Sequence, residues 1–350
     1  MNEMRQMLED SVERLFGDRL DWETQTRIEE EGFPRALWDE VVDQGIHKVL
    51  AAEDAGGLGG GWGDAYPVLR ACGKHAVPLP VAEAMLAEYL AREANCALPE
   101  GVPGLLPCVL DADAFEAAGI VLDGVRTPWG RHAAYLVGVA EGAAGTELVL
   151  ASPEGLAIAE EDNIGRDPRD TLSGTAKILA RHAVPLPADC VRWLGALARS
   201  AQIAGGGVTC LDLAVQYAAE REQFGRPLSA FQAIQHYLAD LAGVVASVDS
   251  ITMAACEAYD QRGMVGAARN ARFEIAAAKC RASEAVEKLT RLSHQVHGAI
   301  GFTYEYGLHF TTRRLWAWRA EFGGAGEWGE FLGRAACDAG GDGVWPLITG

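Results

Sequence analysis

The sequence contains no uninterrupted run of about 18 apolar residues, the length that a transmembrane helix needs. Its first segment, MNEMRQMLEDSVERLF, is acidic and lacks the apolar core of a secretory signal. The eight cysteines form no Cys-x-x-Cys pair and are scattered through apolar stretches. We therefore expect a cytoplasmic protein with buried, reduced thiols and no membrane association.

Basic residues are scarce relative to acidic ones. Lys and Arg number 30 against 49 Asp and Glu, which gives a net charge of −19. This balance argues against nucleic acid as a partner and against an anionic membrane, because both require clustered basic side chains. It leaves room for an anionic ligand in a local basic pocket.

The residues that are present predict a soluble globular chain, with 49% hydrophobic and 23% charged residues. Apolar residues at helical spacing predict helices over 1–48 and about 64–98, with a break near Pro78 and Pro80. The glycine-rich stretch EDAGGLGGGWG at 53–63 predicts a loop.

The character of the sequence changes after the second helical stretch. Short apolar runs bounded by Gly, Pro and Asp between about 103 and 187 predict a small antiparallel β unit. Long Ala-rich amphipathic stretches near 190–222, 230–260 and 266–297 predict a helical bundle. The fold class is therefore mainly α with a small β unit (α+β). We expect an N-terminal helical domain over 1–102, a middle β domain over 103–187 and a C-terminal four-helix bundle over 188–350.

Three segments resemble the acyl-CoA dehydrogenase family. The segment YAAEREQFGRPLSAFQAIQHYLADL, from Tyr217 to Leu241, matches the family's Arg-x-x-Phe-Gly, Pro, Phe-Gln and Leu-Ala-Asp pattern. QVHGAIGFTYEY, from Gln295 to Tyr306, resembles its Gln-x-x-Gly-Gly-x-Gly-Phe-x-x-Glu-Tyr turn. Residues 52–59 resemble its Pro-Glu-x-x-Gly-Gly-x-Gly loop. The resemblance covers nearly the whole chain, and the Arg221–Asp240 segment is its most specific part.

The resemblance implies α,β-desaturation of a CoA thioester with FAD as cofactor and an electron-transfer flavoprotein as acceptor. It also implies that one group of residues contacts FAD, or the subunit interface around it, across a subunit boundary. These residues are Arg221, Gln223, Phe224, Gln232, Gln295 and Gly298. Their chemistry fits, since an arginine fork suits a pyrophosphate and Gln232 can hydrogen-bond an adenine edge. The alternative is that Phe224 and Phe231 staple the bundle while Arg221 pairs with an acid.

The family's reaction needs a carboxylate base, and the sequence departs from the pattern at both family positions for it. A gap-free alignment from the Gln295 turn places the common position on Phe322, one residue after Glu321. The other position, on the helix before Arg221, falls on Gly195. Glu321 is the one candidate catalytic residue, and the alternative is a surface or capping glutamate. One residue on a helix is about 100° of rotation, so we expect Glu321 not to serve as the base.

The family's flavin-contacting Thr-Glu-Pro and Trp-Ile-Thr segments are not found in the predicted β unit. The nearest stretch is RTPWGR at 126–131. The chain therefore resembles the short subunits of α2β2 bacterial acyl-CoA dehydrogenases of steroid and related catabolism. This implies a longer homologue as partner subunit, which supplies the glutamate and the fuller flavin site. The alternative is a non-catalytic scaffold that stabilises a catalytic partner, and a weaker reading is an acyl-CoA oxidase or hydroxylase of the same fold.

Other candidate residues have ordinary interpretations. His294 and His297 stand three residues apart but lack a carboxylate or thiolate at matching spacing, so we expect packing and no metal site. We expect Arg313 and Arg314 to contact a CoA phosphate or the partner subunit; the alternative is that they lie on a solvated helix face. A group of tryptophans is expected to anchor a core or an interface: Trp316, Trp318 and Trp328.

Overall fold

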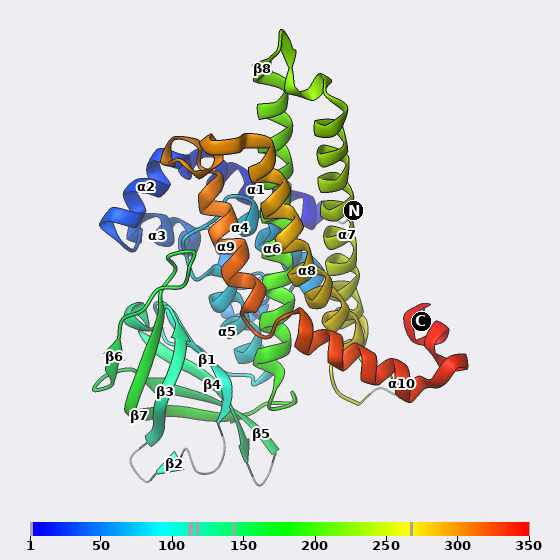
Figure 1. Ribbon diagram of the computed structural model, residues 1–350. Coiled ribbons are helices and arrows are strands. Elements are labelled where there is room, and N and C mark those ends of the chain that lie inside the picture. The colour runs from blue at the N-terminus through cyan, green and yellow to red at the C-terminus, as the bar shows by residue number, and fades with distance from the viewer. Residues whose placement is uncertain (1–2, 111–114, 117–118, 143–144, 267–268, 350) are drawn as a thin grey trace.

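The computed structural model describes residues 3–110, 115–116, 119–142, 145–266 and 269–349 (Figure 1). Helices form the N-terminal part, as expected from the apolar spacing. They are α1 (Glu3–Arg19), α2 (Trp22–Glu31), α3 (Arg35–Asp43), α4 (Trp62–Lys74) and α5 (Val81–Glu93), with short 3-10 turns η1 (Ile46–Lys48) and η2 (Glu53–Ala55). The break between α4 and α5 contains Pro78 and Pro80, as predicted.

The glycine-rich loop leads into α4, whose first amides are bound by a carboxylate of the C-terminal bundle. Asp260 accepts hydrogen bonds from the backbone amides of Trp62 (2.7 Å) and Gly63 (2.8 Å). A Cβ atom on Gly61 would lie 2.6 Å from Oδ2 of Asp260, so only glycine permits this approach. The loop that resembles the family motif therefore joins the N-terminal helices to the bundle.

The middle of the chain forms the predicted β unit. Its strands are β1 (Pro103–Leu110), β2 (Phe115–Glu116), β3 (Gly119–Pro128), β4 (Tyr135–Gly142), β5 (Gly145–Ser152), β6 (Ala157–Ala159) and β7 (Arg169–Ala183), with the turn η4 (Gly130–His132) after β3. The sheet order is β1-β4-β5-β7-β3-β2, and β6 pairs with β7. The expectation of a purely antiparallel unit was wrong for one pair, because β1 and β4 run parallel. The β2–β3 segment lies between them in sequence and provides the crossover that a parallel pair needs.

The C-terminal part is the predicted helical bundle, and it confirms the mainly α fold class. Its helices are α6 (Cys190–Glu220), α7 (Gln232–Arg262), α8 (Arg272–His297), α9 (Leu308–Ala320) and α10 (Ala325–Thr349), the last kinked at Gly340. The short strands β8 (Glu222–Gln223) and β9 (Arg226–Pro227) and the turn η5 (Leu228–Ala230) join α6 to α7, and the turns η6 (Gly298–Phe302) and η7 (Tyr304–Tyr306) join α8 to α9. The β8 hairpin projects from one end of the bundle, and α10 extends away from the other end (Figure 1). The exact domain boundaries stay a prediction.

Helix α7 is long and apolar enough to cross a membrane by length and composition alone. This is weak evidence for a span, because α7 packs against α6 and α8 within the bundle. Its buried residues include Leu241, Val248 and Ala255.

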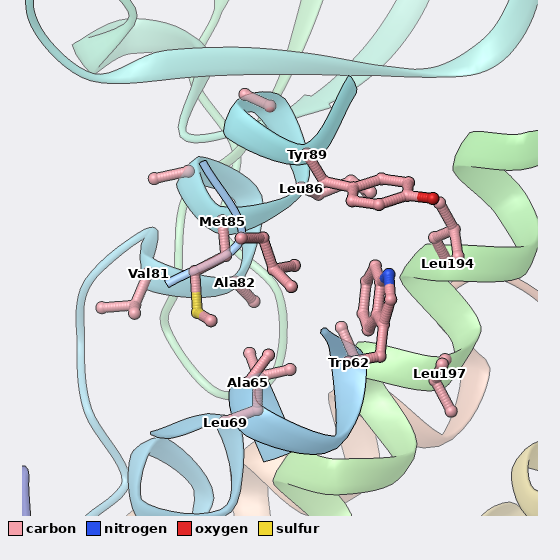
Figure 2. Close-up of a cluster of buried hydrophobic side chains, with 14 of the residues drawn as sticks. Trp62, Ala65, Leu69, Val81, Ala82, Met85, Leu86, Tyr89, Leu194 and Leu197 are labelled. Atoms are coloured by element: carbon pink, nitrogen blue, oxygen red, sulfur yellow. The ribbon is translucent and has the colours of Figure 1, made fainter. Parts of the chain in front are cut away.

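Apolar side chains join the N-terminal helices to the bundle beneath the β unit (Figure 2). Trp62 of α4 and Tyr89 of α5 meet edge to face with ring centroids 5.7 Å apart, and Leu194 and Leu197 of α6 lie beside this pair. The Tyr89 and Tyr259 hydroxyls lie 2.7 Å apart, which satisfies both in this buried place. This packing fixes α5 and α6 relative to each other, and both carry charged residues of the candidate site.

Candidate functional site

Glu321 stands at the end of α9, where the chain leaves the helix (φ −65°, ψ 137°). Its carboxylate is bound by two arginines. Oε1 accepts from Nε of Arg169 at 2.8 Å and Oε2 from Nε of Arg199 at 2.6 Å, while Asn163 donates to Oε1 at 3.1 Å. The Arg169 and Arg199 guanidiniums hold the pKa of Glu321 well below its usual range and outweigh its burial. A carboxylate in this state is a weak proton acceptor.

The ion pairs continue past Glu321 into the N-terminal helices. Arg199 also donates to Glu83 of α5 and to the side-chain oxygen of Gln202. Arg199, Glu83 and Arg169 are 2%, 3% and 5% exposed, so this chain of alternating charges is buried. Glu83 lies on α5, Arg169 on β7 and Arg199 on α6. The network therefore ties all three parts of the fold together at one point.

Phe322, which follows Glu321, packs directly against Gly195 of α6. A Cβ atom on Gly195 would lie 2.5 Å from the Phe322 ring. Phe322 adopts a left-handed backbone conformation (φ 57°), and the Arg199 guanidinium lies 5.7 Å from its ring centroid. The two residues that align with the family's base positions are thus in contact, and the Phe322 ring fills the space beside Gly195.

Lys279 of α8 holds the end of α9 from the opposite side. Its Nζ donates to the carbonyl oxygens of Trp318 (2.7 Å) and Arg319 (3.0 Å), which are among the last carbonyls of α9. Burial lowers the pKa of Lys279 to about 7. Because this lysine caps the helix that ends at Glu321, it helps to fix where Glu321 and Phe322 stand.

A cavity of about 440 Å³ opens in front of Glu321, and we call it the arginine cavity. It lies between the β unit and the end of α9. Its lining residues are Pro107, Arg126, Pro128, Asn163, Arg169, Arg192, Ala317, Ala320, Glu321, Phe322 and Gly323.

The structure places the predicted cofactor residues of the first motif on the exposed hairpin between α6 and α7. Phe224 is 93% exposed and has φ 52°, followed by Gly225 with φ 78°, the pair of positive values of a tight hairpin turn. Arg221, Gln223 and Gln232 are exposed as well. Within the described residues the Arg221 side chain makes no hydrogen bond or ion pair, so the alternative of an intrachain acid partner has no support. The Phe224 ring meets the Phe231 ring edge to face at 6.3 Å, but with 93% of Phe224 exposed this contact lies within the hairpin and does not staple the bundle.

Gln295 and Gly298, the predicted residues of the second motif, are exposed at the end of α8. They line a cavity of about 760 Å³ that we call the Gln295 cavity. His309, which also lines this cavity, has both ring nitrogens buried with no hydrogen-bond partner among the described residues, and Nδ1 of His294 is in the same state. Two histidines with unpaired ring nitrogens thus lie in the cavity wall.

The two motifs lie at the same end of the bundle. The ring of Tyr217, one helical turn before Arg221, stacks on the ring of His297 with centroids 4.8 Å apart. Tyr306 packs edge to face on the same Tyr217 ring at 5.7 Å. The structure thus brings the hairpin and the Gln295 turn together around an aromatic cluster, whereas Glu321 stands at the other end of α9.

The remaining candidates are used inside the chain. Arg313 pairs with Glu29, and the buried Arg314 pairs with Asp167 at 3.1 Å, so neither side chain faces solvent alone. His294 and His297 take packing roles in ring stacks, and no group of metal-binding residues occurs among the described residues. Of the three tryptophans, Trp318 and Trp328 are buried and Trp316 is 38% exposed.

Sequence reasoning missed the residues that surround Glu321. Arg199 interrupts the apolar stretch LGALARSAQIAGGG of α6, and Glu83 interrupts the apolar segment before Tyr89. The available signal was a charge of each sign within a locally apolar stretch of its helix, since buried charges are almost always paired. Arg169 stands among other charged residues and carried no comparable signal.

The chain belongs to the acyl-CoA dehydrogenase family, whose members are oxidoreductases that act on the CH–CH group of acyl-CoA and use FAD. The family's N-terminal domain model matches residues 2–97 and its C-terminal domain model residues 194–327. Acyl-CoA dehydrogenase FadE27 of Mycobacterium tuberculosis is 30% identical over 80% of this chain and 82% of its own length. Acyl-CoA dehydrogenase IpdE2 of the same organism is 28% identical over 89% and 91%.

Solved structures show the same fold. The Tcur3481-Tcur3483 steroid acyl-CoA dehydrogenase matches with a TM-score of 0.85 at 23% identity, covering 96% of this chain and 98% of that one. A chain of the ChsE4-ChsE5 complex of Mycobacterium tuberculosis matches with a TM-score of 0.80 at 22% identity, covering 97% and 98%. At these identities the likeness shows that the fold is shared.

Proposed function

We propose that this chain is a subunit of a heteromeric FAD-dependent acyl-CoA dehydrogenase that contributes flavin contacts and assembly surface, while a longer homologue supplies the catalytic base. The contact between Phe322 and Gly195 carries the proposal. Both family positions for the base hold residues without a proton acceptor, and the neighbouring carboxylate of Glu321 is neutralised by Arg169 and Arg199. An enzyme that removes an α proton cannot do so with these groups.

The flavin contacts in this proposal come from the bundle end with the two motifs. Arg221 offers a pyrophosphate a guanidinium that none of the described residues binds, and Phe224 offers an exposed ring. Gln295 and Gly298 border the Gln295 cavity, whose wall includes histidine ring nitrogens with no partner among the described residues. FAD bound here would supply the hydride acceptor, and these side chains would hold it. Such exposed, unpaired groups are costly to order in a lone chain and suit a cofactor held by a neighbouring subunit.

The alternative, a non-catalytic scaffold subunit, predicts a different role for the hairpin end of the bundle. A purely structural subunit would use the hairpin for protein contacts alone, and Arg221 would not affect the cofactor. Arg221→Ala in the complex with the longer homologue separates the two. We expect flavin affinity to fall by roughly 1.5–3 kcal/mol, the value of one charge-assisted hydrogen bond. Arg334→Ala is the matched control, because Arg334 is a 76% exposed arginine on α10.

The main test is the composition of the active enzyme. Co-expression with a longer acyl-CoA dehydrogenase homologue should give a complex with one FAD per pair of chains and flavin bleaching by acyl-CoA. The chain alone should be poor in flavin. A homotetramer of this chain with one FAD per chain, oxidising acyl-CoA at an ordinary rate of about 1–10³ s⁻¹, would overturn the proposal. Electron-transfer flavoprotein is the acceptor to supply in the assay, again as a proposal.

A further inference from the structure

A cavity of about 560 Å³ lies between the N-terminal helices and the β unit, and we call it the Glu88 cavity. Helix α3, the turns η1 and η2, helix α5 and the first residues of β1 and β4 all contribute to its wall. It shares no lining residue with the arginine cavity or the Gln295 cavity. The Glu88 cavity is therefore separate from both sites described above.

Glu88 of α5 places a half-buried carboxylate in this cavity, and its side chain makes no hydrogen bond or ion pair among the described residues. Glu83, on the same helix, is compensated by Arg199 of the bundle. Burial raises the pKa of Glu88, and the charge of Lys48 lowers it only in part. Lys48 itself donates to the carbonyl oxygen of Ala55 at 3.1 Å. A bound cation would favour the charged form of Glu88 and offset its burial.

Tyr135, the first residue of β4, brings a second uncommitted polar group to the wall. It is 3% exposed, and its hydroxyl makes no hydrogen bond within the part of the chain that the structure describes. Burial and then the charge of Glu88 raise the pKa of Tyr135, so the neutral phenol and the carboxylate act on one another. Because a buried tyrosine hydroxyl usually has a partner, Tyr135 offers an acceptor to a ligand that carries N–H groups.

The charges around the cavity favour a monocation. Its wall carries the acids Asp39, Glu88 and Glu100 and the bases Arg35 and Lys48, so one negative charge is left over (2 − 3). The described residues contain no group of three or more His, Cys, Asp or Glu that could hold a metal ion. The carboxylates are thus too dispersed to chelate a metal, and the remaining charge suits an organic cation.

Aromatic and apolar side chains complete the wall. Trp38 of α3 is 2% exposed and lines the cavity together with Tyr135, and aromatic faces attract organic cations. Leu98 and Pro103 add hydrocarbon surface. His47 also lines the cavity, and burial lowers its pKa to about 4, so at neutral pH it adds no competing charge. The volume of about 560 Å³ lies in the range of small-molecule sites.

We propose that the Glu88 cavity binds a small primary ammonium ion with a compact apolar body. Glu88 holds the charge, and the Tyr135 hydroxyl accepts a hydrogen bond from the ammonium group. The site lies apart from Glu321 and from the flavin contacts proposed above, and an acyl thioester offers no cation to it. The inference therefore goes beyond the proposed function and does not depend on it.

The experiment uses the full-length chain and three probes built on one benzyl group: benzylamine, benzyl alcohol and benzyltrimethylammonium. Isothermal titration at pH 7.5 measures their binding to the wild type and to Glu88→Gln. Benzylamine should bind the wild type and lose about tenfold to hundredfold affinity in Glu88→Gln, the loss expected for one charge-assisted hydrogen bond. Glu93→Gln is the matched control, because Glu93 is also on α5 but pairs with Arg92 and does not line the cavity. It should leave benzylamine binding unchanged.

Two further variants test the cavity itself. Ala97 is exposed on the segment between α5 and β1 and lines the cavity, so Ala97→Trp can fill the space without entering the core. Benzylamine binding should be lost in Ala97→Trp. Tyr135→Phe removes only the hydroxyl and should weaken benzylamine binding by about twofold to tenfold. In the complex with the longer homologue, Glu88→Gln should leave flavin content at the wild-type level, which separates this site from the Arg221 assignment.

Thermal unfolding gives a second readout that does not depend on titration heats. A saturating concentration of benzylamine should raise the Tm of the wild type and of Glu93→Gln, because a ligand that binds only the folded chain stabilises it. Benzylamine should give a much smaller shift in Glu88→Gln. Since that variant removes a charge without a partner, it should fold as well as the wild type.

Three outcomes would overturn the inference. The first is benzyl alcohol binding as tightly as benzylamine, which would mean that charge is not recognised. The second is benzylamine affinity unchanged in Glu88→Gln, Tyr135→Phe or Ala97→Trp. The third is benzyltrimethylammonium binding as tightly as benzylamine, which would mean that the N–H groups are not recognised.

Discussion

The Phe322 ring covers Gly195 so closely that a Cβ atom on that glycine would lie 2.5 Å from the ring. The two residues are 127 positions apart (322 − 195) and come from the end of α9 and the first half of α6. Since each aligns with one of the family's positions for the base, the contact places both positions at the same point in space. The ring of Phe322 and the hydrogen atom of Gly195 therefore stand where the family carries the carboxylate that the reaction requires.

This contact predicts a severe effect for a very small substitution. Gly195→Ala should lower the free energy of unfolding by about 1–3 kcal/mol through overpacking, although alanine is the better helix former. Gly243→Ala on α7 is the matched control, because a Cβ atom there meets nothing within 4 Å. This substitution should raise the free energy of unfolding or leave it unchanged. Urea unfolding of the three chains measures both effects. Adding Phe322→Leu to Gly195→Ala should recover part of the loss, and no recovery would contradict the contact.

Glu321→Gln should behave as a stability variant and leave catalysis intact. The change removes the charge that balances Arg169 and Arg199 in a buried place, and breaking such a pair typically costs about 3–5 kcal/mol. Glu327→Gln, which breaks the surface pair with Arg192, should cost at most about 1 kcal/mol. Thermal unfolding reports the difference. A loss of turnover by several orders of magnitude in a Glu321→Gln complex that is folded and retains its flavin would show that Glu321 is the base after all.

Much of the fold could be predicted because the information is local. The 3.6-residue apolar spacing predicted α6, α7 and α8, and the short apolar runs between Gly and Pro predicted β1, β3, β4, β5 and β7. The parallel pairing of β1 with β4 could not be predicted, since nothing in either strand reports its neighbour. The motifs identified Arg221 and Gln295, whereas their proximity through Tyr217 and His297 appeared only in three dimensions.

The surroundings of Glu321 were beyond sequence reasoning for a related reason. Its partners Arg169 and Arg199 are 152 and 122 residues away in sequence. Pairing at that separation is set by how the β unit and α6 dock, and a single sequence carries no record of that. Sequence reasoning could therefore identify Glu321 as a candidate but could not say that its charge was already neutralised.

Lys279 should make stability rise with pH just above neutrality. Burial lowers its folded-state pKa to about 7 from the ordinary lysine value of 10.5, so between these values the unfolded chain binds one proton more. The free energy of unfolding then increases with pH by up to about 1.4 kcal/mol per unit, and below pH 7 this contribution stays constant. Unfolding at pH 7.0 to 8.5 avoids the buried thiols such as Cys210, whose raised pKa opposes the trend at higher pH.

The measurement compares the wild type with Lys279→Met. The slope of stability against pH should be smaller in the variant, because the titrating amine is gone. Lys288→Met is the control, since that lysine is a 40% exposed partner of Asp240 at the surface, and its slope should match the wild type. Equal slopes in all three proteins would mean that Lys279 is protonated in the folded state at these pH values.

Phe224→Asn should separate the stability of the chain from its assembly. Phe224 is 93% exposed with φ 52°, so it gains little from burial and adopts a conformation that costs an L-residue roughly 1–2 kcal/mol. Asn tolerates this conformation better and favours the hairpin turn with Gly225. The lone chain should therefore be more stable to urea by about 1 kcal/mol.

If the Phe224 ring serves a neighbouring subunit or its flavin, the same substitution should weaken flavin retention in the complex. Such opposite effects are expected where a strained residue is kept for function. Unchanged flavin retention, with the chain stabilised, would mean that Phe224 does not contact the cofactor or its surroundings.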